Sequence, residues 1–274
     1  MNCSVCQQPM VKMTEWAQAC RSCGFECSTL SPGAGRGVEG LEILRKANFK
    51  IILSELSQMR DLTSLKCLEV GCAEGWFMEA LKKQGVEVSA IEPSSHAIEI
   101  QGKGFDVIHG FFPDALPAQN TYDMIVFNDV FEHLPDPVAG IKACERHLKK
   151  GGLLVLNLPN RNGFLYRMSK WMKGLGVAKP FERMWQKEFP SPHISYFSDS
   201  NIEMFVHRHT GLQKEKHFYL ASVVKNGLGP RIQASYGGIA GKIIYVSLLA
   251  FLPAIKFLPQ DIMVFVFAKR GGKE

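Results

Sequence analysis

Residues 65–75 read Leu65-Lys66-Cys67-Leu68-Glu69-Val70-Gly71-Cys72-Ala73-Glu74-Gly75, a short apolar segment that runs into a glycine-containing loop. The apolar segment predicts a buried strand, and residues 76–83 after the loop predict a helix that Gly85 terminates. Residues 86–91 predict a second strand, which ends at Glu92. Strand, glycine loop, helix, strand and terminal acid together indicate a βαβ unit that binds a nucleotide through its loop and the ribose through its acid.

The spacing within the loop limits the class of ligand that it can bind. It is Glu69-x-Gly71-x-Ala73-x-Gly75 rather than the GxGxxG of dinucleotide sites. A carboxylate at position 69 would repel a pyrophosphate but suits a ligand that carries an ammonium group. This loop resembles the first motif of the class I S-adenosylmethionine-dependent methyltransferases, with Ala73 in place of the middle glycine.

The resemblance continues over roughly residues 40–270. Residues 122–137 resemble the family's fourth strand and the loop after it, and residues 151–159 resemble its fifth strand. Between them, Asp136 predicts the cap of a helix that begins at Pro137 and runs to Lys150. Residues 193–212 resemble the segment that precedes the sixth strand, and residues 262–268 resemble the last strand. The resemblance implies a doubly wound, seven-stranded, mostly parallel α/β sheet. The motif style is nearest to small-molecule enzymes, including ubiquinone-pathway O-methyltransferases.

The resemblance also implies where S-adenosylmethionine would bind. The cofactor residues that it implies are Glu69, Gly71, Cys72, Ala73, Gly75, Glu92, Pro93, Phe111, Phe112, Asn128, Asp129 and His133. Many relatives have an acid directly after the third strand's glycine, to hold the adenine, but here Gly110 is followed by Phe111 and Phe112. Two alternatives for the adenine remain, an aromatic face with backbone groups or Asp114 further along.

Methyl transfer to a hydroxyl requires a group that takes the proton, and an imidazole suits this task. The sequence offers His193, which lies where relatives bring a residue over the acceptor, and His133 after the fourth strand. Hydrogen bonding of His193 to the backbone is the structural alternative. Asn128-Asp129-Val130-Phe131 stands where enzymes that methylate exocyclic base amines carry Asn/Asp-Pro-Pro-Tyr, so we expect a small-molecule acceptor.

The first thirty residues contain two CxxC pairs, Cys3/Cys6 and Cys20/Cys23, separated by thirteen residues. Two such turns can close a tetrahedral thiolate shell around Zn²⁺, with no position open for a substrate. We therefore predict a structural zinc module over residues 1–30. Residues 31–37 are small or helix-breaking and predict a linker, after which residues 38–274 form the methyltransferase domain.

Two further segments stand out. Residues 161–190 carry seven basic and two acidic side chains, interleaved with aromatic ones. This insert predicts either a lid that offers cations to an anionic acceptor or an amphipathic segment whose aromatic residues pack on the domain. Residues 239–258 are mostly apolar but are interrupted by Pro253. They predict a buried helix or a dimer contact, with a helix on a membrane surface, serving a lipid-linked acceptor, as the alternative.

The composition places limits on function. Among 274 residues with a net charge of +6, the insert contributes +5, so the chain as a whole is not a basic nucleic-acid-binding protein. An RNA methyltransferase that uses the zinc module and the insert, and a scaffold that binds cofactor without catalysis, remain alternatives. Met1 leads into Asn2-Cys3 without a signal-like segment, and the CxxC pairs suit a reducing compartment, so we expect a cytoplasmic location. The sequence leaves the oligomeric state open.

Overall fold

A computed structural model describes residues 1–31, 33, 41–223, 228–229, 232, 238–255 and 257–270. Its main sheet has seven strands in the order β10-β11-β8-β7-β4-β5-β6, and all are parallel except β11, which runs antiparallel to both neighbours. The predicted doubly wound, mostly parallel sheet is therefore confirmed. The strands are β4 (Lys66–Val70), β5 (Glu87–Glu92), β6 (Asp106–His109), β7 (Tyr122–Asn128), β8 (Leu148–Pro159), β10 (Gln213–Leu220) and β11 (Ile262–Ala268).

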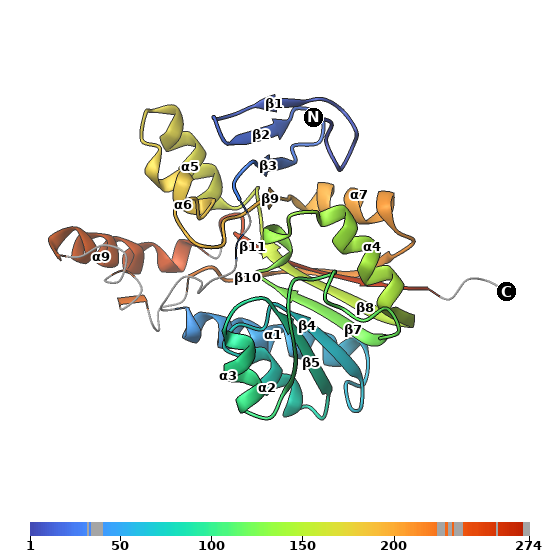
Figure 1. Ribbon diagram of the computed structural model, residues 1–274. Helices are drawn as coiled ribbons and strands as arrows, with labels where there is room; N and C mark the ends of the chain where they lie inside the picture. Colours follow the sequence, from blue (N-terminus) through green and yellow to red (C-terminus); the bar gives the residue numbers. More distant parts are fainter. Residues whose placement is uncertain are drawn as a thin grey trace.

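Helices cover both faces of this sheet (Figure 1). One face carries α1 (Glu42–Met59), α2 (Trp76–Lys82) and α3 (His96–Gly102), and the other carries α4 (Pro137–His147) and α7 (Asp199–His209). The chain winds outward from β4 through β5 to β6, then returns to the other side of β4 with β7 and β8. The strand order therefore reverses between β4 and β7, and ligands of such sheets bind outside the carboxyl ends of the strands at this point.

One predicted boundary is wrong. The sequence predicts that the helix after Asp136 runs to Lys150, but α4 ends at His147 and β8 begins at Leu148. Leu148 is buried and pairs with Tyr122 at the start of β7, and Lys149 Nζ donates to Asp123 (2.8 Å). Sheet pairing therefore overrides the helical pattern over these residues.

The amino-terminal residues form a second, antiparallel sheet of β1 (Met10–Lys12), β2 (Ala17–Cys20) and β3 (Glu26–Ser28). Its fourth strand, β9 (Ser195–Tyr196), is distant in the sequence and pairs with β3. Val5 and Phe25 are buried in the hydrophobic core that lies between the main sheet and helices α4 and α7. The small sheet is thus continuous with the larger domain. The predicted linker, residues 31–37, lies largely outside the described residues.

The insert of residues 161–190 contains α5 (Phe164–Gly174) and α6 (Lys179–Met184), which lie beside the small sheet (Figure 1). Its buried aromatic side chains form a separate cluster with Tyr196, and Met13 and Trp16 of the amino-terminal segment pack against that cluster. The insert therefore packs on the rest of the molecule as its amphipathic pattern predicts, and it holds the amino-terminal segment in place.

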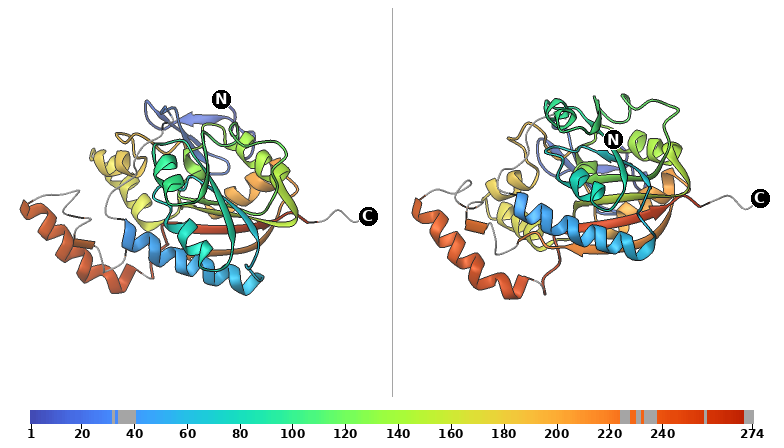
Figure 2. Two further views of the ribbon diagram at one scale, coloured as in Figure 1. Left: turned by 60° about the horizontal axis from the view of Figure 1, so that its bottom comes forward. Right: turned by 90° about the horizontal axis from the view of Figure 1, so that it is seen from below.

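Helix α9 (Gly238–Ile255) extends away from the main body of the molecule (Figure 2). Ile239, Ile243 and Val246 are exposed, so the prediction of a helix buried within this chain is wrong for these side chains. Among the described residues, none of the helices combines the length and apolar character that crossing a bilayer requires.

Candidate active site

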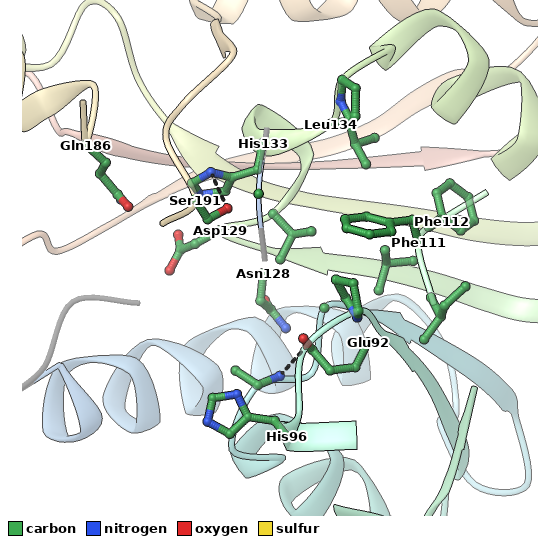
Figure 3. Close-up of a pocket in the computed structure, with 18 of the residues that line it drawn as sticks. Glu92, His96, Phe111, Phe112, Asn128, Asp129, His133, Leu134, Gln186 and Ser191 are labelled. Atoms are coloured by element: carbon green, nitrogen blue, oxygen red, sulfur yellow. Dashed lines mark hydrogen bonds between the residues drawn. The ribbon is translucent and has the colours of Figure 1, made fainter. Parts of the chain in front are cut away.

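A cavity opens at the carboxyl ends of β4, β5 and β7, at the reversal of strand order (Figure 3). Most of the predicted cofactor residues line it, and they come from four separate loops. The predicted residues in its lining are Gly71, Ala73, Glu92, Pro93, Phe111, Phe112, Asn128, Asp129 and His133. The structure therefore brings together, in one cavity, segments that are more than sixty residues apart in the sequence.

The loop after β4 follows a left-handed path. Gly71 and Gly75 have φ values of 74° and 78°, and Ala73 has a φ of 43°, in the region that favours glycine. A Cβ on Gly71 would lie 2.6 Å from Cγ2 of Val130. The glycine thus allows the loop to approach Val130 closely, and the steric conflict of a larger residue there is with Val130 before any ligand.

Glu92 ends β5 and turns its buried carboxylate toward the loop. Its two carboxylate oxygens accept hydrogen bonds from the backbone N–H groups of Ala73 (3.0 Å) and Ser94 (2.9 Å). The dashed line at the labelled Glu92 in Figure 3 marks the first of these two bonds. Each carboxylate oxygen has a further lone pair, so Glu92 can hold the loop and still accept hydrogen bonds from a pair of ligand hydroxyls.

Three predicted cofactor residues lie behind the cavity rather than in its lining. Glu69 is 2% exposed and accepts a hydrogen bond from the amide of Asn128 (3.1 Å), while burial raises the pKa of its carboxyl to about 8. Cys72 is buried in the core that Met78 and Ala90 share. Gly75 precedes α2 as its amino-terminal cap. These three residues support the loop and the wall of the cavity without lining the cavity themselves.

The structure distinguishes between the two groups that could contact an adenine, the aromatic residues after Gly110 and Asp114. Phe111 is half exposed, at 51%, and lines the cavity together with the buried Phe112. Asp114 is exposed and is not among the described residues that line the cavity. An aromatic ring, rather than the Asp114 carboxylate, is thus available at this end of the cavity.

A second cavity adjoins the first, and Leu41, Arg45, Asp129 and Gln186 line both. Its wall contains Glu132 and His193, together with residues of the insert and of α1. Arg45 and Asp129 form an ion pair (3.5 Å) at the boundary. We call the cavity at the glycine loop the first chamber and the adjoining cavity the second chamber.

His133 and His193 meet at the boundary between the two chambers, with ring centroids 4.8 Å apart. Burial lowers the pKa of His133, and burial together with the neighbouring His133 lowers the pKa of His193 well below its usual range. The lowered pKa values favour the neutral form of both rings near pH 7. Nδ1 of His133 lies 2.9 Å from the carbonyl oxygen of Pro192 and so carries the proton, which leaves a lone pair on Nε2. Nε2 of His193 lies 2.9 Å from the amide nitrogen of Gln186 and accepts from it.

The structure places several residues at the site that the sequence analysis missed. They are Leu41 and Arg45 from the α1 end, His96 from α3, Glu132 from the 3₁₀ turn Phe131–His133, and Gln186 and Ser191 from the insert and the residues after it. Glu132 directly precedes the predicted His133 within residues 122–137, so Glu132 had a local signal. Arg45 and Gln186 reach the site through tertiary packing and had none.

The four predicted zinc ligands lie together at one end of the small sheet. The Sγ atoms of Cys3 and Cys23 are 3.5 Å apart, those of Cys6 and Cys20 are 3.4 Å apart, and all four lie within 4.8 Å of one another. The same segment supports the second chamber, because Ser28 donates from its hydroxyl to the carbonyl of His193 (2.8 Å) and from its N–H to that of Ile194 (2.8 Å).

Comparison with known proteins agrees with this geometry. The family model described as "Methyltransferase domain" matches residues 42–217. The ubiquinone biosynthesis O-methyltransferase of Idiomarina loihiensis is 28% identical over 147 residues, which are 50% of this chain and 57% of that protein. The enzyme of the same name from Xylella fastidiosa is 33% identical over 117 residues, 40% of this chain and 48% of that protein. The chain thus spans about half the length of these curated relatives.

Solved structures show the same fold at low identity. The cyclopropane synthase MmaA2 from Mycobacterium tuberculosis aligns with a TM-score of 0.59 and 18% identity, over 87% of this chain and 90% of that one. Magnesium protoporphyrin IX methyltransferase from Synechocystis, solved with bound S-adenosylhomocysteine, aligns with a TM-score of 0.55 and 14% identity over the same shares. With the family model matching more than half of its length, the chain belongs to the methyltransferase domain family.

Proposed function

We propose that the protein transfers a methyl group from S-adenosylmethionine to a hydroxyl group of a small molecule. The observation that carries this proposal is the pair of adjoining chambers, one at the glycine loop and one beside it, with two neutral histidines at their boundary. Bound S-adenosylmethionine supplies an electrophilic methyl group on a sulfonium. The chain itself must orient the acceptor, exclude water and provide for removal of a proton.

The residues of the first chamber fit such a cofactor. The Glu92 carboxylate is placed to accept hydrogen bonds from ribose hydroxyls, and Phe111 offers its ring to an adenine. Asn128 and the Asp129 carboxylate stand where an amino-acid moiety with its ammonium group would be bound. His133 and His193 then face the acceptor hydroxyl from the second chamber, as the groups that deal with its proton.

The ion pairs that the insert's basic side chains form favour a small-molecule acceptor over RNA. Arg161 and Lys170 both pair with the fully buried Glu26 (2.7 and 2.6 Å), and Lys187 pairs with Glu182 (2.6 Å). These cations stabilise the fold and are not aimed at a polyanion, which disfavours RNA as the acceptor. Arg45 and Arg183 both line the second chamber, so an anionic acceptor would meet positive charge there.

Metabolite profiling with an isotopically labelled methyl donor tests the proposed activity. The purified protein should transfer label from S-adenosylmethionine to a hydroxylated compound of low molecular mass in a cell extract, whereas buffer alone should not. Label that appears in RNA would favour the nucleic-acid alternative. Tight binding of S-adenosylhomocysteine with no labelled product would favour a scaffold that binds cofactor without turnover.

We also propose that Cys3, Cys6, Cys20 and Cys23 bind one structural Zn²⁺. Their sulfur–sulfur separations of 3.4 and 3.5 Å suit a tetrahedral shell with Zn–S distances of about 2.3 Å. Elemental analysis should find one zinc per chain, and Cys20→Ser should lose it together with protease resistance of residues 1–30. Cys27→Ser is the matched control, since Cys27 lies outside the quartet. Zinc content that is unchanged in Cys20→Ser would contradict this ligand set.

Finally, we propose that the acceptor is presented at a membrane surface, in a reducing cytoplasmic setting. The exposed Ile239, Ile243 and Val246 of α9, with the exposed Lys242 between them, support contact with the headgroup region of a bilayer. A lipid-linked acceptor would reach the second chamber from such a surface. Co-sedimentation of the protein with lipid vesicles tests this contact.

A further inference from the structure

Polar side chains from four separate segments line the second chamber. They are Asn48 of α1, Glu132 of the 3₁₀ turn, Asn160 directly after β8 and Asp261 directly before β11. Asn48, Glu132 and Asn160 are buried, although such side chains favour the surface. The wall of the chamber therefore carries hydrogen-bonding groups that a mainly apolar acceptor would leave without partners.

Asp261 places a carboxylate in this wall. The antiparallel pairing of β11 with β8 brings it beside Asn160, whose N–H donates to the Asp261 carbonyl (2.8 Å). The carboxylate accepts from the N–H of Leu165 (2.8 Å) and from the hydroxyl of Ser222 (3.0 Å), one bond to each oxygen. Among the described residues, no lysine or arginine forms an ion pair with it. Each oxygen keeps a lone pair, so Asp261 can accept hydrogen bonds from two ligand hydroxyls.

The Glu132 carboxyl has an unsatisfied atom. Its Oε2 is buried and has no hydrogen-bond partner among the residues that the structure describes. A buried polar atom without a partner costs free energy, so it requires an explanation. Burial and the neighbouring Asp129 raise the pKa of this carboxyl well above its usual range, which favours the protonated form, a donor and an acceptor at once. A ligand hydroxyl, which also donates and accepts, would satisfy it.

The two buried amides have hydrogen-bonding capacity to spare. Asn48 donates one amide hydrogen to the carbonyl of Ala221 (3.0 Å), and Asn160 donates one to the carbonyl of Gln260 (3.0 Å). Each amide has a second hydrogen to donate and an oxygen with two lone pairs. Both can therefore bind a ligand hydroxyl without giving up the bonds that hold them in place.

The aromatic side chains of the wall do not select a flat aromatic acceptor. Tyr166 and Tyr196 stack on each other with centroids 4.1 Å apart, and their hydroxyls donate to Glu26 and to the carbonyl of Met184 (3.2 Å). Of the aromatic rings described in this wall, Phe189 remains. A single ring packs against the C–H face of a saturated ring as well as against a phenol, so the polar groups decide the class of acceptor.

We propose that the acceptor is a sugar, whose neighbouring ring hydroxyls bind to Asp261, Asn160 and Glu132. A sugar combines several hydroxyls with apolar C–H faces and so matches both kinds of group in the wall. A site built to hydrogen-bond hydroxyls rejects molecules that lack them, because its buried polar groups are then left unpaired. This inference rests on the proposed function, whose acceptor class it names. A soluble sugar and the headgroup of a glycolipid share this chemistry.

The transfer to a sugar balances with the proposed methyl donor. The O–H bond of one hydroxyl breaks, and its proton is lost finally to solvent. The oxygen forms a bond to the methyl carbon, and the C–S bond of the sulfonium breaks with its electron pair remaining on sulfur as a neutral thioether. Asp261 takes no part in these bond changes, so it is a specificity-determining residue for the acceptor.

Saturation-transfer nuclear magnetic resonance on the full chain, with saturating S-adenosylhomocysteine, tests the site. The probes are the methyl and octyl glycosides of glucose, mannose, galactose and rhamnose, with catechol as the phenol. At least one glycoside should bind, and catechol should not. Asp261→Asn keeps an oxygen for the Leu165 N–H and should bind that glycoside about tenfold more weakly, the loss expected for one hydrogen bond to a charged group. The exposed Asp106→Asn is the control and should match the wild type.

Deoxy analogues of the bound glycoside separate hydroxyl recognition from a structural role of Asp261 at the start of α5. The analogue that lacks the hydroxyl bound to Asp261 should bind the wild type about tenfold more weakly, yet bind Asp261→Asn as well as the parent glycoside does. Losses that add for every deoxy analogue would overturn the proposal. Retained affinity for S-adenosylhomocysteine shows that each variant is folded.

Tighter binding of the octyl than of the methyl glycoside would support a glycolipid headgroup, and equal binding would support a soluble sugar. Failure of every glycoside to bind, or equal affinity in the wild type and Asp261→Asn, would overturn the proposal. Methyl transfer to catechol and to none of the glycosides would overturn the sugar acceptor and leave the proposed function standing. Glycoside binding that depends on Asp261, without methyl transfer to any acceptor, would support the site and contradict the function.

Discussion

Glu69 is the residue whose environment departs most from what its place in the motif indicates. Its carboxyl is buried behind the glycine loop, and desolvation is the main cause that raises its pKa to about 8. In the unfolded chain a glutamate has a pKa of about 4.3. The folded state therefore favours the protonated carboxyl, and the stability that this provides is present below about pH 4.3 and lost as the pH rises toward 8.

Replacement of Glu69 by glutamine should remove this pH dependence. Glutamine keeps an oxygen that can accept from Asn128 but cannot ionise. The free energy of unfolding of Glu69→Gln, relative to the wild type, should increase between pH 5 and pH 8 by on the order of 1 kcal/mol per pH unit. Urea denaturation at several pH values measures this difference, and a difference that stays constant over the range would show that Glu69 titrates normally.

Gly71 should tolerate no side chain, because of its positive φ and the 2.6 Å approach to Val130. Gly71→Ala should destabilise the protein by about 1–2 kcal/mol and weaken S-adenosylhomocysteine binding, since the loop must shift. Gly102→Ala is the matched control, because a Cβ there would meet no described atom within 4 Å. Calorimetric unfolding measures the loss of stability, and isothermal titration measures the affinity for S-adenosylhomocysteine. If the two alanine variants behave alike, the strained loop is not required.

Among the individual site residues, the sequence predicted those that belong to a local motif. Gly71, Ala73, Glu92 and Asn128 reach the cavity because each stands at the end of a strand or just after it, and the carboxyl ends of parallel strands share one edge. It could not predict that Cys72 turns away, because the direction of a loop side chain depends on its dihedral angles. Arg45, His96 and Gln186 were missed because tertiary packing alone brings them to the site.

Among the elements, the contact between β3 and β9 connects the amino-terminal segment to the active site. Glu26 in β3 is fully buried and accepts from Arg161 and Lys170 of the insert as well as from the Tyr166 hydroxyl. Glu26 itself pairs with Tyr196, and Cys27 pairs with Ser195, two residues after His193. The sequence predicted the metal ligands but not this role, since a pairing across about 170 residues leaves no local signal.

Glu26→Ala should destabilise the protein by about 3 kcal/mol. The variant leaves two cations without their buried partner, and the estimate is at the low end for such a loss because both cations are partly exposed. Turnover should also fall, because the β3–β9 contact positions the backbone of His193. Glu15→Ala in the same segment is the control, and its exposed pair with Lys12 should contribute less than about 1 kcal/mol. Comparable stability of the two variants in urea denaturation would contradict the role of Glu26.

For the whole molecule, α9 is the part whose position the sequence did not predict. Its apolar composition indicated burial, yet the helix projects from the body and exposes Ile239, Ile243 and Val246 (Figure 2). Periodicity shows that a segment is apolar but does not identify what covers it. The sheet order, by contrast, followed from the βαβ pattern together with the family resemblance.

The protein should bind vesicles of mixed phosphatidylcholine and phosphatidylglycerol through α9. Ile243→Glu combined with Val246→Glu should reduce co-sedimentation with the vesicles at least fivefold, because charges on the apolar side oppose insertion. Ile98→Glu is the control, since Ile98 is equally exposed, at 65%, on α3. Equal co-sedimentation of the α9 variant and the wild type, or none by the wild type, would contradict the membrane contact.

The central claim is that the cavity at the reversal of strand order binds S-adenosylmethionine and its product. Isothermal titration with S-adenosylhomocysteine tests it most directly, in the wild type, in Glu92→Ala at the cavity end of β5, and in Glu87→Ala at the exposed start of the same strand. We predict one binding site in the wild type, affinity at least tenfold weaker in Glu92→Ala and unchanged in Glu87→Ala, and no heat with NAD. Equal affinity in all three proteins, or no binding by the wild type, would contradict the account.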